Sequence, residues 1–413
     1  MNNRILKVLA IRPFLLLWIA ELFSQLAFNM MGFILIVVAY SVSKSSAAVS
    51  GVVLSFTIPA IILGLIAGVY VDRWNKKKVL FSVNIIRALL LVLLAYFHDS
   101  LVVILFLSFA ISTATQFFVP AESPMIPFIV RKNLLLPANA LFGIGIYGSM
   151  LVAYALSGPF LILLGNRNIF LLLAIFILIA AVFIFFINTD SKESEGAVSE
   201  DKINLPTTLR LEIKQLFKII LKTKEIYHSL FLLTLSQTIV LIVAVVGPGY
   251  VNQVLNVPIN QFPILFITPA ALGMVIGSLI LSNFLHVGAR ERSVTFGLLL
   301  SAFAFILLSY GVRISLYLPP ILSMNALRLM VFLSFILGVS NALVFIPSNT
   351  FLQENTPDSF RGKIYGALNA LTGIFSILPI ILVGWLSDAF GVAKVISGIG
   401  ITILIVGVAR LFM

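Results

Sequence analysis

Apolar residues fill this chain in long runs, which short segments rich in charge, proline or glycine separate. A helix of about 20 apolar residues crosses the hydrocarbon core of a bilayer, and about twelve runs reach that length. Their approximate ranges are 13–41, 47–71, 78–97, 101–121, 137–164, 168–188, 227–252, 262–286, 293–312, 323–347, 362–386 and 392–411. We therefore predict an all-α membrane protein with twelve transmembrane helices.

One polar interval, residues 189–225, divides six runs from six. Its first part, DSKESEGAVSEDKIN, is rich in serine and acids, as flexible linkers are. Its second part, TTLRLEIKQLFKIILKTKE, separates apolar and basic residues on two helical faces. This pattern predicts an amphipathic helix on an anionic inner leaflet. A solvated connector without membrane contact is the alternative.

The six-plus-six division predicts an N-terminal bundle (1–188), a cytoplasmic linker (189–225) and a C-terminal bundle (226–413). A weak internal repeat agrees with it, because PAIILGLIAG in the second run corresponds to PAALGMVIG in the eighth. Two pseudo-symmetric six-helix bundles of this kind are typical of secondary transporters.

Composition narrows the class of protein. Hydrophobic residues make up 61% of the chain and charged residues 10%, whereas soluble domains carry about 25% charged residues. The chain has no cysteine, which excludes a thiolate metal site, and its three histidines lack ligand spacing. HExxH, GxSxG and P-loop motifs are also absent from the sequence. We expect no enzyme, no cofactor and no metal.

The formal charge of +12 has an uneven distribution along the chain. Of 27 basic residues, 21 fall on the side of the N-terminus and 4 on the opposite side. Cytoplasmic loops of membrane proteins carry such an excess. We therefore predict a multi-pass protein of the inner (plasma) membrane with both termini in the cytoplasm. The orientation of the protein in the membrane accounts for the excess of basic residues, so we expect no nucleic-acid partner.

The densest charge in the chain lies in GVYVDRWNKKKVL, residues 68–80. This stretch resembles the signature loop between helices two and three of the major facilitator superfamily. The matching residues are Gly68, Asp72, Arg73, Lys76 and Lys77. Asn75 stands where the family usually has glycine, and asparagine tolerates a left-handed backbone better than other residues with a side chain.

The resemblance covers nearly the whole chain and is closest to bacterial macrolide-efflux and enterobactin-exporter-like proteins. The segments FFVPA, PANAL and LQENTPDSFRGKIYGALNA resemble that subgroup. The resemblance implies a transporter that works by alternating access. It also implies that helix two of one half packs against helix eleven of the other.

A carboxylate at a membrane border is costly unless it has a partner. We therefore predict that Asp72, Arg73 and Arg361 form a latch on the cytoplasmic side. Further predicted members of this inner gate are Gly68, Lys76, Lys77, Glu122, Arg131 and Gly362. The alternative is that the charged loop only anchors the topology.

Polar residues within spans are functional candidates. Glu21, Gln25 and Asn29 recur every four residues in the first run, so they share one helical face. The resemblance places helix one beside the central cavity, and we predict Glu21 as the proton-coupling carboxylate. A glutamate hydrogen-bonded between helices is the alternative. Weaker candidates for substrate contact are Gln116, Gln237 and Asn341.

Two further features lie within the spans. Arg87 is in the third run, with Glu21, Asp72 or Glu122 as possible partners, and we favour a structural ion pair. In the fifth run, Gly145, Gly158 and Pro159 match part of the family's exporter signature. Tyr154 departs from that signature, which leaves ordinary helix packing as an alternative.

Together these features predict a proton-coupled exporter, an antiporter of a small amphiphilic or hydrophobic compound. The expected partners are a small-molecule substrate, protons and an anionic inner leaflet, and we expect the monomer to be functional. A lysophospholipid or lipid flippase of the same fold is the main alternative, because the 35 phenylalanines suit such a cargo equally well. A membrane sensor remains open.

Overall fold

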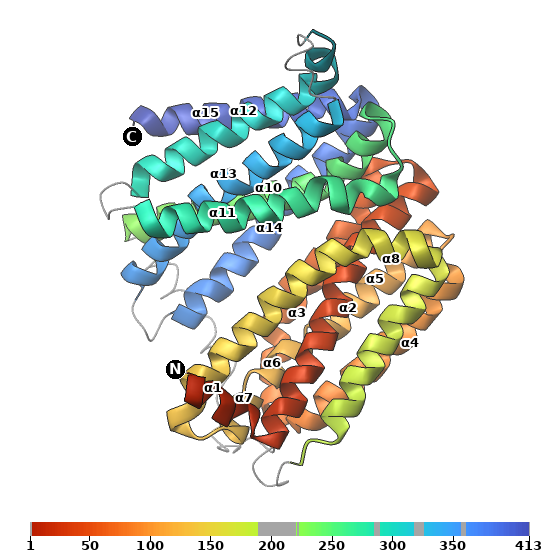
Figure 1. Cartoon of the computed structure of the whole chain (residues 1–413), viewed down its shortest axis with the longest axis vertical. Helices are drawn as coiled ribbons and strands as arrows, with labels where there is room; N and C mark the ends of the chain where they lie inside the picture. Colours follow the sequence, from red (N-terminus) through yellow and green to blue (C-terminus); the bar gives the residue numbers. More distant parts are fainter. Residues whose placement is uncertain are drawn as a thin grey trace. The chain divides into compact units, whose positions relative to one another are not determined.

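The structure is a computed structural model that describes residues 2–188, 220, 223–284, 290–317, 326–356 and 361–412. Regular structure in these ranges is helical (Figure 1). The described part contains eleven helices that are long and apolar enough to cross a membrane. One of them, Pro137–Phe185, has 49 residues and includes two of the predicted runs. The prediction of an all-α membrane protein with twelve spans is therefore confirmed.

The long helix α8 (Leu135–Phe185) is two helices joined at Gly165. Gly165 has φ 71° and ψ 175°, a conformation that side chains beyond glycine rarely adopt. The ribbon turns back on itself, so α8 forms two limbs (Figure 1). These limbs correspond to the predicted runs 137–164 and 168–188, and one glycine is enough to separate them.

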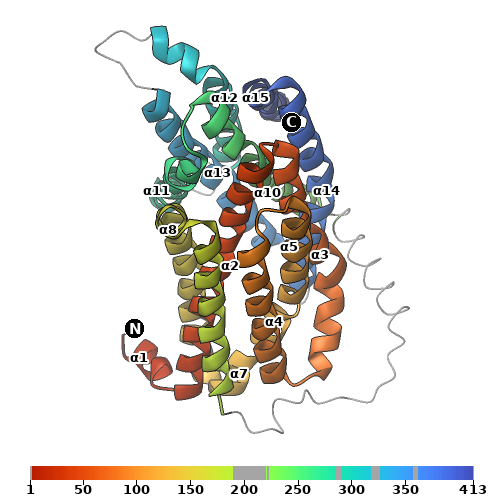
Figure 2. The ribbon, with the colours of Figure 1, turned by 90° about the vertical axis from the view of Figure 1, so that its right-hand side faces the viewer.

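The chain divides into two compact units, and unit 1 comprises residues 1–43 and 54–200. Its helices are α1 (Asn2–Leu9), α2 (Arg12–Ser43), most of α3 (Ser46–Arg73), α4 (Lys76–Phe97), α5 (Leu101–Thr115), α6 (Phe118–Glu122), α7 (Met125–Ile129) and α8. Helix α2 packs against α8, and α4 packs against α5 and α8 (Figure 2). Their shared core contains Phe14 and Phe142, whose ring centroids are 5.8 Å apart.

The fourth span of unit 1 is a broken helix. We predicted one run over 101–121, but α5 ends at Thr115, and two five-residue helices, α6 and α7, complete a span that ends at Ile129. The segment FFVPAESPMIP explains the break, because a proline lacks the backbone N–H and clashes with the preceding turn. The short helix α6 is important below because it carries Glu122.

The turn between α3 and α4 corrects one reading of the sequence. We considered Asn75 suited to a left-handed backbone, but its φ is −66° and its ψ is 112°, which is extended. Its Oδ1 instead accepts a hydrogen bond of 3.0 Å from the backbone N–H of Lys78. Asparagine is among the preferred N-cap residues, so Asn75 stabilises the first turn of α4.

Unit 2 comprises residues 44–53 and 201–413. Its helices are α10 (Lys224–Gly249), the π-helical segments η2 (Tyr250–Val254) and η4 (Pro263–Ile267), α11 (Thr268–Phe284), α12 (Arg290–Tyr317), α13 (Ala326–Asn355), α14 (Arg361–Phe390) and α15 (Val392–Ala409). Helix α13 packs against α10, α11 and α12. Helix α12 also packs against α15.

Two glycines bring α11 and α13 unusually close together. A Cβ atom on Gly338 would lie 1.8 Å from the carbonyl oxygen of Ala270, and one on Gly273 would lie 2.0 Å from that of Phe335. No side chain fits at either distance, so both positions need glycine. Small residues are the usual means of close helix packing within a membrane.

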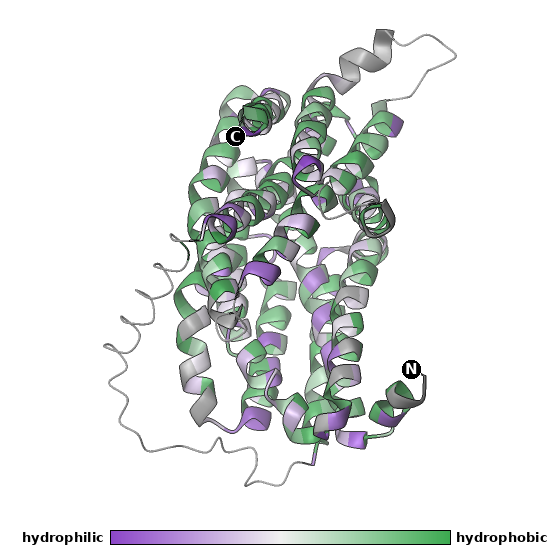
Figure 3. Ribbon diagram, turned by 90° about the vertical axis from the view of Figure 1, so that its left-hand side faces the viewer, coloured by the Kyte–Doolittle hydropathy of each residue, from purple (hydrophilic) through white to green (hydrophobic). Residues whose placement is uncertain are grey.

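Large apolar side chains are exposed along many of the spans, and most of the helical ribbon is hydrophobic (Figure 3). Examples are Phe106, Leu163 and Phe375, which are 70%, 77% and 63% exposed. Such surfaces are stable in contact with lipid chains. Nearly all of the polar interval 189–225, with the predicted amphipathic helix, lies outside the described residues.

Candidate functional site

Three ionisable side chains lie buried together in unit 1. Glu21 of α2 is 0% exposed, Arg87 of α4 is 2% exposed, and Glu122 of α6 is 6% exposed. Each comes from a different helix, and Arg87 has electrostatic interactions with both carboxylates. Charged groups within a membrane are costly and are usually paired and functional. We call Glu21, Arg87 and Glu122 the buried triad.

Neutral groups hold the guanidinium of Arg87 in place. Its Nη1 donates to Ser24 Oγ at 3.0 Å and to Asn84 Oδ1 at 3.3 Å. The guanidinium also lies over the rings of Phe28 and Phe118, 5.6 Å and 5.5 Å from their centroids. Aromatic faces stabilise a cation that has lost its water. Arg87 is therefore fixed by these contacts without a short ion pair.

The two carboxyl groups of the triad interact with each other. Glu122 interacts electrostatically with Glu21 as well as with Arg87. Glu21 Oε2 and Glu122 Oε1 are buried and have no hydrogen-bond partner. Two acids and one base are electrically balanced when the pair holds one proton.

The polar stripe predicted on the first span is present on α2. Gln25 Nε2 donates to Glu21 Oε1 at 2.8 Å, and Asn29 Nδ2 donates to the carbonyl oxygen of Gln25 at 2.8 Å. Gln25 and Asn29 are half-buried, whereas Glu21 is fully buried. The stripe therefore connects the triad to more accessible positions one and two turns along the helix.

The broken fourth span brings one acid to this cluster. Within a membrane, irregular backbone is tolerated where protein buries it or where it lines a cavity. Discontinuous helices also mark the substrate and ion sites of many transporters. Glu122 ends the five-residue helix α6, so the break itself positions a carboxyl group beside Glu21.

The glycines of the predicted exporter signature lie on α8. A Cβ atom on Gly145 would lie 2.9 Å from Trp18 Nε1, so Gly145 makes room for the indole, which donates to the carbonyl oxygen of Leu141 at 2.9 Å. Gly158 is buried and Pro159 lies inside the helix. The close approach of Trp18 explains why a glycine is needed at position 145. The role of Gly145, Gly158 and Pro159 in export stays a prediction.

The weaker substrate candidates are separate from the triad. Gln116 Nε2 donates to the carbonyl oxygen of Ser112, one turn earlier in the broken span, at 3.3 Å. In unit 2, Asn341 Oδ1 accepts a short hydrogen bond from Ser236 Oγ. Gln237 is exposed. Their roles in substrate contact stay predictions.

The predicted inner gate falls partly outside the described residues. Asp72 and Arg73 end α3, and Arg361 and Gly362 begin α14, but the side chains of Asp72, Arg73 and Arg361 are not among those described. The gate's other predicted residues have these positions: Gly68 is half-buried, Lys76 is buried, Lys77 lies 5.7 Å over the ring of Phe185, and Arg131 is exposed. The latch stays a prediction.

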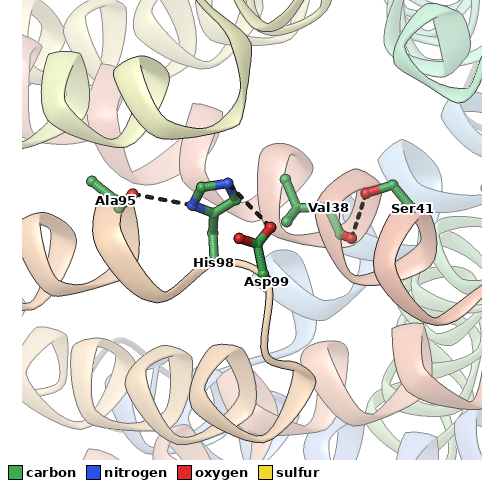
Figure 4. Close-up of polar contacts among 5 residues, drawn as sticks. All are labelled: Val38, Ser41, Ala95, His98 and Asp99. Atoms are coloured by element: carbon green, nitrogen blue, oxygen red, sulfur yellow. Dashed lines mark hydrogen bonds and ion pairs between the residues drawn. The ribbon is translucent and has the colours of Figure 1, made fainter.

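The loop after α4 shows what an ordinary polar contact of this protein looks like (Figure 4). His98 Nδ1 lies 3.1 Å from the carbonyl oxygen of Ala95, and its Nε2 lies 3.4 Å from Asp99 Oδ1. The Asp99 side chain is 87% exposed. This contact ends a helix at the surface, whereas the buried triad is shielded from water.

Reasoning from the sequence identified all three members of the triad but did not bring them together. It assigned Glu122 to the inner gate and left the partner of Arg87 open. It missed Ser24 and Asn84, the hydrogen-bond partners of Arg87. Asn84 had one available signal, because residues three apart on a helix are neighbours.

A polytopic helical protein with buried charges at a broken span has the features of a membrane transporter. The sequence profile described as Major Facilitator Superfamily matches residues 17–379. The chain belongs to this superfamily and is a secondary transporter, not an enzyme.

Two relatives agree with the assignment. The MFS-type transporter YfiS of Bacillus subtilis (strain 168) is 23% identical over 385 residues, which cover 92% of this chain and 87% of YfiS. YvqJ of the same organism is 22% identical over 86% of this chain and 81% of its own length.

Among solved structures, a mutant of the nucleoside transporter NupG has a TM-score of 0.76 at 15% identity, covering 96% of this chain and 99% of that one. The POT family transporter PepTSo has a TM-score of 0.67 at 13% identity, covering 97% of both chains. At these identities the likeness is one of fold.

Proposed function

We propose that this transporter is a proton-coupled exporter of a small amphiphilic or hydrophobic compound. The buried triad is its proton site, and the burial of two acids, Glu21 and Glu122, beside the single base Arg87 is the observation that carries the proposal. The polar stripe of Gln25 and Asn29 is the path between this pair and the substrate.

The charge balance gives the proposal its mechanism. With one proton on the acid pair, Arg87 balances the remaining carboxylate. Without that proton the triad carries one uncompensated negative charge in a medium of low dielectric constant, which is costly. Release of the proton therefore has to be matched by another change, such as the arrival of cargo or a change of access. This linkage is what exchange of a proton for a cargo requires.

Several features of the sequence support the direction and the orientation that we propose. The resemblance to the macrolide-efflux and enterobactin-exporter-like subgroup and the signature residues Gly145, Gly158 and Pro159 favour export. The distribution of basic residues favours cytoplasmic termini in the plasma membrane. In this proposal two six-helix bundles of one monomer alternate access, with the residues from Gly68 to Lys77, Arg131 and Arg361–Gly362 at the inner gate.

Inside-out vesicles that contain the protein provide the test. Ethidium serves as an amphiphilic cation, and its uptake is followed by fluorescence with and without an imposed proton gradient. We expect Glu21→Gln and Glu122→Gln to abolish gradient-driven uptake, because neither variant has an exchangeable carboxyl pair. Glu225→Gln, which alters an exposed acid at the start of α10, is the matched control and retains uptake.

A second arm of the experiment uses labelled lysophospholipid in the same vesicles. Movement of the lipid without ethidium uptake would replace the exporter by a flippase. Gradient-driven uptake that survives in both Gln variants would remove the triad from the coupling step while leaving the transporter assignment intact.

A further inference from the structure

Helix α4 and the second limb of α8 pack against each other within unit 1, and each exposes one apolar face (Figure 1). The exposed positions of α4 recur at the spacing of one helical face, and those of the second limb of α8 do the same. The exposed apolar side chains are Ile86, Leu89 and Leu93 on α4, and Ile175, Leu178 and Val182 on α8.

A cation and a ring join the two helices at one end of these faces. Lys77 Nζ lies 5.7 Å from the centroid of the Phe185 ring, and the ring centroids of Phe81 and Phe185 are 5.8 Å apart. Phe185 and Phe186 are both exposed, and their ring centroids are 5.6 Å apart. The ammonium group of Lys77 therefore lies where the exposed apolar faces end, beside rings that the protein covers only in part.

The opposite end carries a second contact of this kind. The guanidinium of Arg167 lies 4.5 Å from the centroid of the Tyr96 ring, which is exposed together with the neighbouring Phe97. Each contact joins α4 to α8, so the exposed faces of the two helices adjoin at both ends and form one surface. We call this surface the α4–α8 face. Neither Arg167 nor Lys77 has an ion-pair partner among the described residues.

The separation of the two cations matches the thickness of a bilayer. Helix α4 has 22 residues and is therefore about 33 Å long, and the hydrocarbon core of a bilayer is about 30 Å thick. Lys77 is in the first turn of α4 and Tyr96 is in its last turn. When α4 spans the membrane, Lys77 and Arg167 therefore reach the headgroups of opposite leaflets. Aromatic side chains are enriched at these depths.

The chemistry of both cations suits a phosphate group. An arginine that stacks on a ring keeps the N–H groups at the edge of its guanidinium available for two parallel hydrogen bonds to phosphate oxygens. A lysine provides a point charge, and Lys78, the next residue after Lys77, adds a second, exposed one. A phospholipid carries its phosphate just outside its acyl chains. Cation, ring and apolar side chains follow one another in the same order on the α4–α8 face.

We propose that the α4–α8 face binds phospholipid in both leaflets, with Arg167 holding the phosphate of one lipid and Lys77 that of another. The acyl chains lie along the apolar side chains between the two cations, and the exposed rings pack against the glycerol region. Lys77 and Lys78 together favour a headgroup with a net negative charge at their end. These lipids are part of the protein surface and are not cargo, so the inference stands apart from the proposed function.

Native mass spectrometry of the full-length protein counts the lipids that stay bound during a titration with phosphatidylglycerol. We expect two bound lipids of higher affinity. Lys77→Gln and Arg167→Gln should each retain one of them and bind the other about 5-fold more weakly, which corresponds to about 1 kcal/mol for one cation beside an anionic lipid. Lys394→Gln removes an exposed cation at the start of α15 and is the matched control, which binds both lipids unchanged.

Two further variants separate the role of the charge from that of the ring. Lys77→Arg keeps a cation at the same position and should bind both lipids as tightly as the unaltered protein does. Phe185→Leu keeps the cation and removes its ring, and we expect binding at that end to weaken about 2-fold.

Lipid binding that stays unchanged in both Gln variants overturns the proposal, and so does an equal loss in Lys394→Gln. Displacement of the lipids by an excess of glycerol 3-phosphate also overturns it, because the sites would then bind a soluble phosphate without acyl chains. Gel filtration shows which variants are folded. If Lys77→Gln fails to fold, Phe185→Leu tests the same end of the face.

Discussion

The interiors of the two units are built on different principles. In unit 1, the buried polar side chains include the charged residues Glu21, Arg87 and Glu122. In unit 2, the buried side chains with polar groups among the described residues are serines, threonines and Tyr250. There, the closest packing depends on glycines between α11 and α13. Among the described residues, the buried charged side chains therefore lie in unit 1, and coupling chemistry should be tested there first.

The largest expected effect comes from removing the base of the triad. Arg87→Met retains the length of the side chain but leaves two buried acids without a cation. Breaking a buried ion pair costs about 3–5 kcal/mol. Thermal unfolding in detergent should show this loss of stability.

A second variant checks the cause of that loss. Arg87→Met combined with Glu122→Gln removes one of the two acids that are left without a cation and should recover part of the stability. If the double variant is as unstable as Arg87→Met alone, packing of the guanidinium between Phe28 and Phe118 matters more than charge.

The glycine packing of unit 2 should give the next largest effect. Gly338→Ala puts a Cβ atom 1.8 Å from the carbonyl oxygen of Ala270, so α11 and α13 have to move apart. Overpacking of this kind costs about 1–3 kcal/mol. Gly366→Ala in α14 is the matched control, since its Cβ meets nothing within 4 Å, and it should be neutral or stabilising. Equal melting temperatures for the two variants would contradict the close contact.

A neutral hydrogen bond of unit 2 should have a smaller effect. Tyr250 is 1% exposed and its hydroxyl donates to the carbonyl oxygen of Leu308 at 2.7 Å. Tyr250→Phe removes this bond at nearly constant volume and should cost about 1 kcal/mol. Chemical denaturation measures it, and a loss as large as that of Arg87→Met would abolish the distinction between the two interiors.

The smallest effect is expected at the exposed contact of His98 and Asp99 (Figure 4). Exposed ion pairs contribute little because water and salt screen them. Asp99→Asn should leave the melting temperature unchanged at both low and high salt. A clear salt-dependent loss would mean that the surface charge of unit 1 contributes to its stability as well as the buried triad.

The spans were predictable because hydropathy over about 20 residues depends only on local sequence. The stripe of Glu21, Gln25 and Asn29 was predictable for the same reason, since helix geometry places residues four apart on one face. The proximity of Glu21 and Glu122 was not, because it depends on how the broken fourth span packs against α2. The proline-rich end of the fourth run was visible, yet its hydrophobicity suggested a continuous helix.

Asn75 and Asp388 illustrate a second limit. Asn75 precedes α4 and Asp388 lies in the last turn of α14, but a sequence does not reveal which helix a polar side chain caps. Asn75 caps the helix that follows it, and Asp388 caps one more than 300 residues away. Local propensity identifies the chemistry of such residues, and tertiary packing selects their partners.

The brevity of α6 has a kinetic consequence. A helix of five residues has almost no internal hydrogen bonds to break, so α6 can rotate without any tilt of α5, the helix that precedes it. The carboxyl group of Glu122 therefore lies on one of the two five-residue helices of its span, while Glu21 lies on a helix of 32 residues. We expect the amides of α6 to exchange with deuterium sooner than those of α5. We also expect Glu122 to move away from Glu21 by a small local rotation of α6, before either bundle moves.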